Sequence, residues 1–197
     1  SSEIETNVNP TQGTVFIEDG ENAFALYTKG LYEVEVTESD RTVALTLFRA
    51  FPNEVAQPKA VMGQMQTGMT FEYAAAFSGV LTPASALQNS VAWKSGLRTF
   101  GTGSHTGVLK AEQSFFALDS ANSVVSALTL KSENIGVLRI FNPGEQTDKA
   151  VFALAKPIAK AAETDLLGNE KSALIIKDGK VLLSLRPHEI KTVEFAF

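Results

Sequence analysis

The sequence predicts an all-β protein: an antiparallel β-sandwich, with a large sandwich followed by a smaller C-terminal one. Apolar residues alternate with polar ones in short runs, as where Val34 and Val36 alternate with Glu33 and Glu35. Turn-forming pairs such as Asp-Gly at 178–179 separate these runs. Successive side chains of a strand point to opposite faces, so this alternation buries one face of a sheet and exposes the other.

The same alternation places the strands along the chain. Asp178 and Gly179 tolerate positive φ, which predicts a two-residue hairpin turn between two of them. Phe195, between Glu194 and Ala196, belongs to the last run. We expect strands over residues 14–18, 23–28, 31–37, 42–50, 70–78, 108–117, 124–131, 136–141, 149–155, 159–165, 173–177, 180–185 and 190–196.

One short crossing helix is expected near residues 83–94. Thr82 can cap it, and Pro83 suits the first helical position because its missing N–H would have no partner there. Leu87 and Val91 fall on one face of such a helix.

Two domains are expected. Residues 1–120 form part of the large sandwich and residues 121–197 form the small one, with a boundary at 118–122, where the stretch Asp-Ser-Ala-Asn-Ser separates two apolar runs. Two long irregular loops, 52–68 and 98–107, interrupt the first part. Long loops of this kind often carry function.

Composition excludes several classes. The 197 residues carry a formal net charge of −5, which argues against nucleic-acid binding. No cysteine is present, so disulfides and thiolate chemistry are excluded. No apolar run is long enough to cross a bilayer. The chain opens with Ser1 and Ser2 instead of methionine and shows no signal peptide, so we expect a fragment of a longer protein.

The residues show no obvious catalytic or metal site. The two histidines, His105 and His188, lack a neighbour at metal-ligand spacing, so we expect them in a loop and a turn. The glycine-rich stretch 101–107 resembles a phosphate-binding loop superficially. It lacks the terminal Gly-Lys-Ser/Thr, and a strand is expected after it, so we interpret it as a flexible loop.

Carboxylates and aromatic residues give no specific signal either. With 22 acidic residues, a glycosidase-like pair is easily imagined, but solvated surface charge is the default interpretation. The acids weighed for this role are Glu33, Glu35, Glu112 and Glu194. Three aromatic residues could stack on a sugar ring, although core packing is the stronger expectation. They are Trp93, Phe100 and Tyr27.

Five segments in order carry a more specific pattern, including Gly30-Leu31-Tyr32 in the first and Asn142-Pro143 in the fourth. Together they resemble the C-terminal β region of glycoside hydrolase family 38, the α-mannosidases. The segments cover residues 15–36, 42–51, 68–74, 126–143 and 185–195.

The resemblance implies a parent enzyme with an α/β barrel, a helical bundle and β-sandwiches. That enzyme hydrolyses α-mannosides with retention, through an Asp nucleophile and a zinc ion held by His and Asp of the barrel. No counterpart of these residues occurs here, so no catalytic or metal residue is assigned. The implied partners are the barrel, the bundle and a mannose-containing oligosaccharide, with a homo-oligomer left open. A bacterial cytoplasmic location is expected.

In the family, a loop from the β region helps to close the sugar site. The irregular stretch after Phe48 is our candidate for it. Its polar side chains are Arg49, Asn53, Glu54 and Gln57. A loop that satisfies its own polar groups is the alternative for these four residues. His188 and Glu189 are expected to be structural turn residues.

Two other functions remain open from the residues. An independent carbohydrate-binding module would need a flat row of exposed aromatics, and the chain has one Trp and three Tyr. An adhesin or other structural sandwich would show repeats or an anchoring tail, and neither is visible. The family 38 fragment is therefore the preferred hypothesis.

Overall fold

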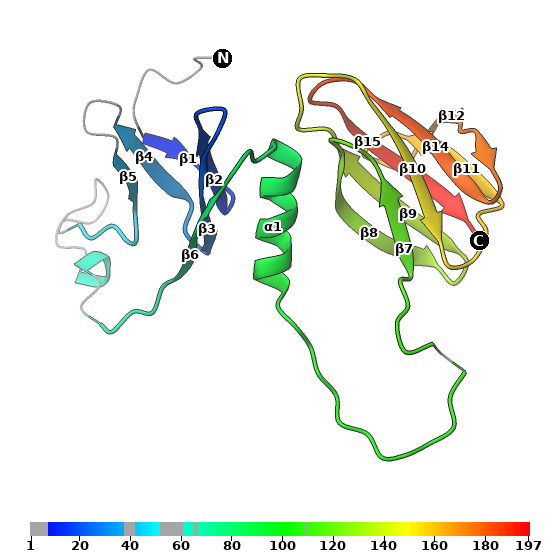
Figure 1. Cartoon of the computed structure of the whole chain (residues 1–197), viewed down its shortest axis with the longest axis horizontal. Helices are drawn as coiled ribbons and strands as arrows, with labels where there is room; N and C mark the ends of the chain where they lie inside the picture. Colours follow the sequence, from blue (N-terminus) through cyan, green and yellow to red (C-terminus); the bar gives the residue numbers. More distant parts are fainter. Residues whose placement is uncertain (1–7, 38–41, 52–60, 65–66, 109) are drawn as a thin grey trace. The chain divides into compact units, whose positions relative to one another are not determined.

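The computed structural model describes residues 8–37, 42–51, 61–64, 67–108 and 110–197. Strands β1 to β15, the helix α1 and a short 3-10 helix at Val61–Gln64 make up its regular structure (Figure 1). The chain divides into two compact units. The first unit holds Ser1–Leu81 and Asn89–Gly96, and the second unit holds Thr82–Gln88 and Leu97–Phe197.

The first unit contains two three-stranded antiparallel sheets. One has the order β1-β4-β5, with bounds Val8–Pro10, Glu33–Thr37 and Thr42–Leu45. The other has the order β2-β3-β6, with bounds Thr14–Glu18, Ala23–Lys29 and Glu72–Ser78. β3 is the most buried strand of the unit because it pairs on both sides and carries apolar residues along most of its length.

Helix α1 spans Pro83–Ser95 and confirms the predicted helix. The Thr82 hydroxyl caps it by accepting a 3.1 Å bond from a first-turn backbone N–H. Leu87 on this helix is half-buried and Val91 is 57% exposed. The buried helix positions are instead the small residues Ala84, Ala86 and Ser90.

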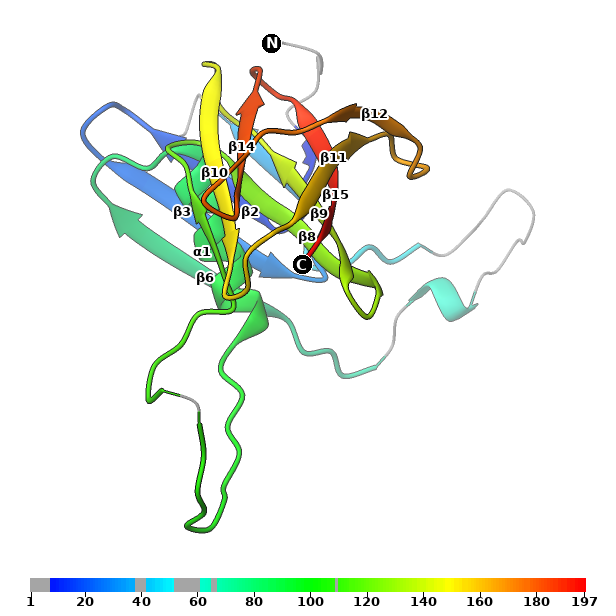
Figure 2. The same ribbon diagram turned by 90° about the vertical axis from the view of Figure 1, so that its right-hand side faces the viewer.

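The second unit is an antiparallel sandwich of a four-stranded and a five-stranded sheet (Figures 1 and 2). The four-stranded sheet has the order β13-β14-β10-β7, with bounds Ile176–Lys177, Lys180–Leu185, Asp148–Leu154 and Phe116–Asp119. The five-stranded sheet has the order β12-β11-β15-β9-β8, with bounds Glu170–Ala173, Lys160–Thr164, Ile190–Ala196, Ile135–Phe141 and Val124–Ser132. The all-β prediction with one helix is confirmed.

The core of the second unit lies between its two sheets. Phe152 of the four-stranded sheet is fully buried, and its ring centroid lies 5.3 Å from that of Phe195 in the other sheet. Gly136 on β9 makes room for this contact, because a Cβ there would overlap the Phe195 ring. The other buried core residues are Leu138, Ile140, Ala150, Ile158, Ala161, Val181, Leu183, Leu185 and Val193.

A buried carboxylate ties the two sheets together at one end. Asp148 begins β10, and its Oδ2 accepts bonds from the Ser123 backbone N–H at 2.8 Å and the Ser123 hydroxyl at 2.6 Å, just before β8. The Ser120 hydroxyl and the Asn122 backbone N–H donate to the same oxygen. Burial raises the pKa of Asp148, but these four donors outweigh it and hold the pKa below its ordinary value.

A buried amide has the same role near the ends of β9 and β14. Asn142 is fully buried, and its Nδ2 donates to the carbonyls of Gln146 at 2.8 Å and Arg186 at 3.0 Å. Its Oδ1 accepts from the Gly144 N–H at 3.0 Å. Within the described residues, no buried side-chain nitrogen or oxygen lacks a hydrogen-bond partner. The free-energy penalty of an unsatisfied buried polar group is therefore avoided there.

Some predicted strands differ from the structure. The strand predicted over 42–50 ends at Leu45, because β4 begins at Glu33 and leaves the later residues without a strand to pair with. The strand predicted over 108–117 is wrong for most of its length: only from Phe116 does the chain pair with β10. The run 173–177 divides into β12 and β13, and β1 was not predicted. β7 precedes residue 121, and the domain boundary there stays a prediction.

Gly136→Ala should destabilise the protein, because the added methyl group must displace the buried Phe195 ring. Overpacking of this kind costs about 1–3 kcal/mol in free energy of unfolding. Urea denaturation followed by circular dichroism would measure it. Gly101→Ala is the matched control, because a Cβ at Gly101 meets nothing within 4 Å. Equal stability of the two variants would contradict this packing.

Asp148→Asn should lower the free energy of unfolding at pH 7 by about 1–3 kcal/mol, because buried donors lose a charged acceptor. The folded-state pKa of Asp148 is lowered, so its contribution is complete above the ordinary value of 3.8 and is lost as the pH falls through the folded pKa. The difference between variant and wild type should shrink in that acid range. Asp178→Asn, at an exposed turn position, is the control and should leave the free energy of unfolding at pH 7 nearly unchanged.

Candidate functional site

Arg49, the first residue of the predicted sugar-site loop, lies in an ion pair at the surface of the first unit. Its Nη2 donates to both carboxylate oxygens of Glu33 at 2.6 Å. The Thr46 hydroxyl donates to Oε1 of the same carboxylate at 2.7 Å. The Arg49 side chain is 70% exposed and that of Glu33 is 29% exposed, so the guanidinium faces solvent above a partly covered carboxylate.

The pairing of β4 with β5 produces this cluster. Val34 is the register partner of Leu45, which places Glu33 opposite Thr46, and the Thr46 N–H donates to the Glu33 carbonyl at 3.1 Å. Arg49 follows three residues later, within reach of the carboxylate. The Arg49 and Thr46 donors, in that order of strength, hold the pKa of Glu33 below its ordinary value. The same ion pair raises the pKa of Arg49.

Sequence reasoning treated Glu33 as a solvated surface charge and missed this partnership. The register of the hairpin was the signal available for it. The other three predicted loop residues, Asn53, Glu54 and Gln57, lie outside the described residues. Their part in a sugar site stays a prediction.

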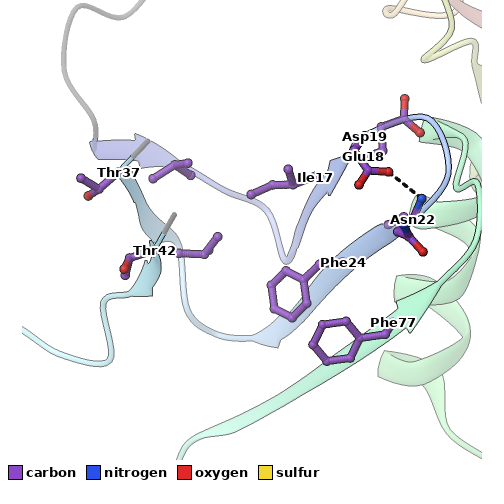
Figure 3. A pocket seen from close by; sticks show the side chains of 11 residues that line it. Ile17, Glu18, Asp19, Asn22, Phe24, Thr37, Thr42 and Phe77 are labelled. Carbon is purple, nitrogen blue, oxygen red and sulfur yellow. Dashed lines mark hydrogen bonds between the residues drawn. The ribbon is translucent and has the colours of Figure 1, made fainter. Parts of the chain in front are cut away.

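A pocket of about 780 Å³ opens in the first unit, between β2-β3-β6 and the β4-β5 hairpin (Figure 3). Its walls are apolar: Phe24 and Phe77 stand with ring centroids 5.1 Å apart, and Phe77 is 84% exposed. Ile17 and Val43 line the pocket from β2 and β5. The polar lining residues are Glu18, Asp19, Asn22, Thr37 and Thr42.

Asp19 at the pocket rim has a structural role. Asp19 accepts backbone bonds from Asn22 at 2.7 Å and Glu21 at 3.0 Å, so its carboxylate holds a turn together. These two bonds, that from Asn22 first, keep the pKa of Asp19 below its ordinary value. A general acid needs a raised pKa. Asp19 is therefore poorly suited to act as a general acid.

The histidines lie where the sequence placed them, in a loop and a turn. His105 is exposed and its Nδ1 lies 2.9 Å from the Gly103 carbonyl. His188 has φ 58° and pairs with Glu145 at 3.3 Å. Glu189 accepts the Arg186 N–H at 2.7 Å, which closes the turn before β15. In the described part of the chain, no three His, Cys, Asp or Glu residues form a group that could hold a metal ion.

The three aromatic candidates for sugar stacking have different environments. Tyr27 is buried in β3 and is core, as the stronger expectation held. Trp93 is half-buried, with the Lys29 ammonium 4.7 Å from its ring centroid. Phe100 is 93% exposed. Phe100 belongs to the second unit and the other two to the first.

The glycine-rich stretch 101–107 has no regular structure, and no helix follows it in the described residues. It thus lacks the helix that a phosphate-binding loop requires. None of the described helices has the length and hydropathy of a membrane span.

Arg49→Gln should raise the pKa of the Glu33 carboxyl toward its ordinary value of 4.5, because the charged donor is lost while the Thr46 hydroxyl remains. NMR titration of the Glu side-chain carbons would follow it. Arg98→Gln, in an exposed segment without strand pairing, is the control and should leave Glu33 unchanged. An unaltered Glu33 titration in R49Q would rule out the ion pair in solution.

Comparison with known proteins shows which family the second unit resembles in sequence. The model for the "Glycosyl hydrolases family 38 C-terminal beta sandwich domain" matches residues 122–193, within the second unit. No curated protein sequence matches the chain.

Solved structures extend the likeness in fold to nearly the whole chain. The crystal structure of an alpha-mannosidase from Enterococcus faecalis V583 is similar over 98% of this chain and 22% of its own, with a TM-score of 0.78 and 24% identity. The structure of a protein in glycosyl hydrolase family 38 from Enterococcus faecalis is similar over 96% of this chain and 23% of its own, with a TM-score of 0.75 and 23% identity. The chain thus spans less than a quarter of either protein. The resemblance expected from the sequence is confirmed: residues 122–193 match the family 38 C-terminal β-sandwich model, and nearly the whole chain has the fold of the corresponding region of the two solved structures.

Proposed function

We propose that this chain is the non-catalytic C-terminal β-sandwich region of a family 38 α-mannosidase. The observation that carries the proposal is the likeness in fold to an alpha-mannosidase over 98% of this chain and only 22% of the other. The family match over residues 122–193 supports it independently. In this proposal, the longer protein hydrolyses α-mannosides with retention, and this region supports its catalytic barrel and helical bundle.

The zinc ion of the parent enzyme is assigned to the catalytic barrel. The described residues do not fit it, because they offer no group of three or more His, Cys, Asp or Glu side chains within reach of one ion. The two histidines have other contacts: His105 lies against the Gly103 carbonyl in a loop, and His188 pairs with Glu145. No step of the reaction is assigned to this chain.

Arg49 is the residue of this chain that we propose to meet the sugar. Within the described residues, both bonds of its guanidinium run through Nη2 to Glu33, so Nε and Nη1 remain to donate to a ligand hydroxyl. Glu33, whose carboxylate also accepts the Thr46 hydroxyl, holds the Arg49 side chain in place, which lowers the entropy lost on binding. The proposed ligand is a mannose-containing oligosaccharide, and the proposed location is the cytoplasm of a bacterium.

A carbohydrate-binding module is the second candidate. Tyr32 and Tyr73 of the first unit are 68% and 57% exposed, and tyrosine rings are suited to stack on sugars. Titration calorimetry with mannose oligosaccharides separates the two candidates. Binding to this chain alone that disappears in the Tyr32→Ser variant would favour the module. No heat at millimolar ligand would favour the scaffold.

The chain alone, supplied with zinc and an aryl α-mannoside, should show no turnover, whereas the longer protein should hydrolyse the same substrate. Release of the aryl chromophore measures both. In the longer protein, Arg49→Ala should raise KM, because a sugar contact is lost, and Lys171→Ala, at an exposed edge strand, should not. Robust turnover by the isolated chain would overturn the proposal.

A further inference from the structure

Residues 97–115, the arm, leave the end of α1 and return to the start of β7 without strand or helix in their described part (Figures 1 and 2). Every described residue of the arm is exposed. Its end is anchored, because the Phe115 carbonyl accepts the Ala155 N–H at 2.9 Å just after β10. The arm is therefore a long projection with a fixed base.

The arm carries large apolar side chains that contact little of the molecule. Leu97 is 98% exposed, Phe100 93%, Val108 100% and Phe115 69%. Single exposed apolar residues are ordinary, but several on one projecting segment mark a binding surface. Leaving a Leu or Phe side chain in water forfeits the favourable free energy of its burial. These side chains can contribute hydrophobic stabilisation only when a partner buries them.

The apolar residues occupy the two legs of the arm, and the tip is polar. Residues 101–107 contain three glycines with Thr102, Ser104, His105 and Thr106. Leu97 and Phe100 precede this tip, while Val108 and Phe115 follow it. A partner that covers the legs and leaves the tip in water would bury the apolar side chains and keep the polar ones hydrated.

The apolar surface continues from the base of the arm into the sandwich of the second unit. A hollow of about 600 Å³ is lined by Phe115 together with Leu128, Leu130 and Leu154. Leu130 is itself 71% exposed. Phe197 closes the hollow, with the Lys156 ammonium 5.7 Å from its ring centroid. Phe115 thus belongs to both the arm and this hollow, and we call the exposed apolar residues of the legs together with those of the hollow the patch.

We infer that the arm docks on an apolar surface of the preceding, catalytic part of the same polypeptide. This inference rests on the proposed function. The chain spans only 22% and 23% of the two similar structures, so most of such a protein lies outside this region and is available to cover the patch. A partner on the same polypeptide acts at a high effective concentration, which favours it over a second copy.

The charges of the arm agree with such a partner. Arg98 and Lys110 are its cations and Glu112 its only anion, so the arm carries a formal charge of +1 (two minus one). The surface that fits it is apolar, with at most a weakly acidic rim. A nucleic acid, which needs clustered cations, does not fit it.

Hydrogen exchange of the longer protein, followed by mass spectrometry, tests the inference. Without a partner, the backbone amides of residues 97–108 lack strand or helix bonds and should exchange at the intrinsic rate. We expect exchange slower by at least about tenfold in the longer protein, since docking excludes water. Phe100→Asp should restore the intrinsic rate. Thr102→Asp, at the polar tip, should keep the protection and is the matched control.

Exchange at the intrinsic rate in the wild-type protein would refute the inference, and this outcome does not depend on whether a variant folds. Protection that survives Phe100→Asp would also refute it. Protection that falls on hundredfold dilution would identify a second copy as the partner and overturn the choice made here. Mannosidase activity, assayed on the same sample, reports on the proposed function separately, so the two can fail independently.

Discussion

The burial of Phe152 against Phe195 is the interaction on which the second unit depends, because it joins the inner faces of its two sheets. A small residue and two groups of polar contacts accompany this aromatic contact. Gly136 is small where the Phe195 ring needs space, and Asp148 with its serine donors links the strand starts at one end of the sandwich. Asn142, just after β9, donates to the Arg186 carbonyl just after β14 and so links the ends of these two strands. The apolar contact supplies the driving force, while these polar groups select one arrangement of the sheets.

The first unit is built differently. Its two sheets have three strands each, and an apolar pocket with Phe24 and Phe77 opens between β2-β3-β6 and the β4-β5 hairpin. Its polar side chains serve the fold: Asp19 holds a turn, and Glu33 binds Arg49 and Thr46. Carboxylates used in this way are ionised acceptors with lowered pKa values, which makes them poor general acids.

A scaffold role is consistent with both units. Buried polar groups satisfy one another, and the surface features that remain are an arginine held in place by a carboxylate and an arm with exposed apolar legs. These features are suited to meeting other parts of a larger protein. In the proposed function, the groups that carry out the chemistry lie outside this region, which helps to hold them in position.

The sequence by itself determined the fold class, the single helix and most strands, because alternation has a period of two and turn residues such as Asp178-Gly179 act locally. It also carried the family resemblance, through ordered local motifs. The strand predicted over residues 108–117 was wrong before Phe116. The same apolar pattern is compatible with a strand that pairs in a sheet and with a segment that has no strand neighbour. Only the tertiary structure decided the pairing of Glu33 with Arg49 and the contact of Phe152 with Phe195, since both depend on register and packing between segments distant in sequence.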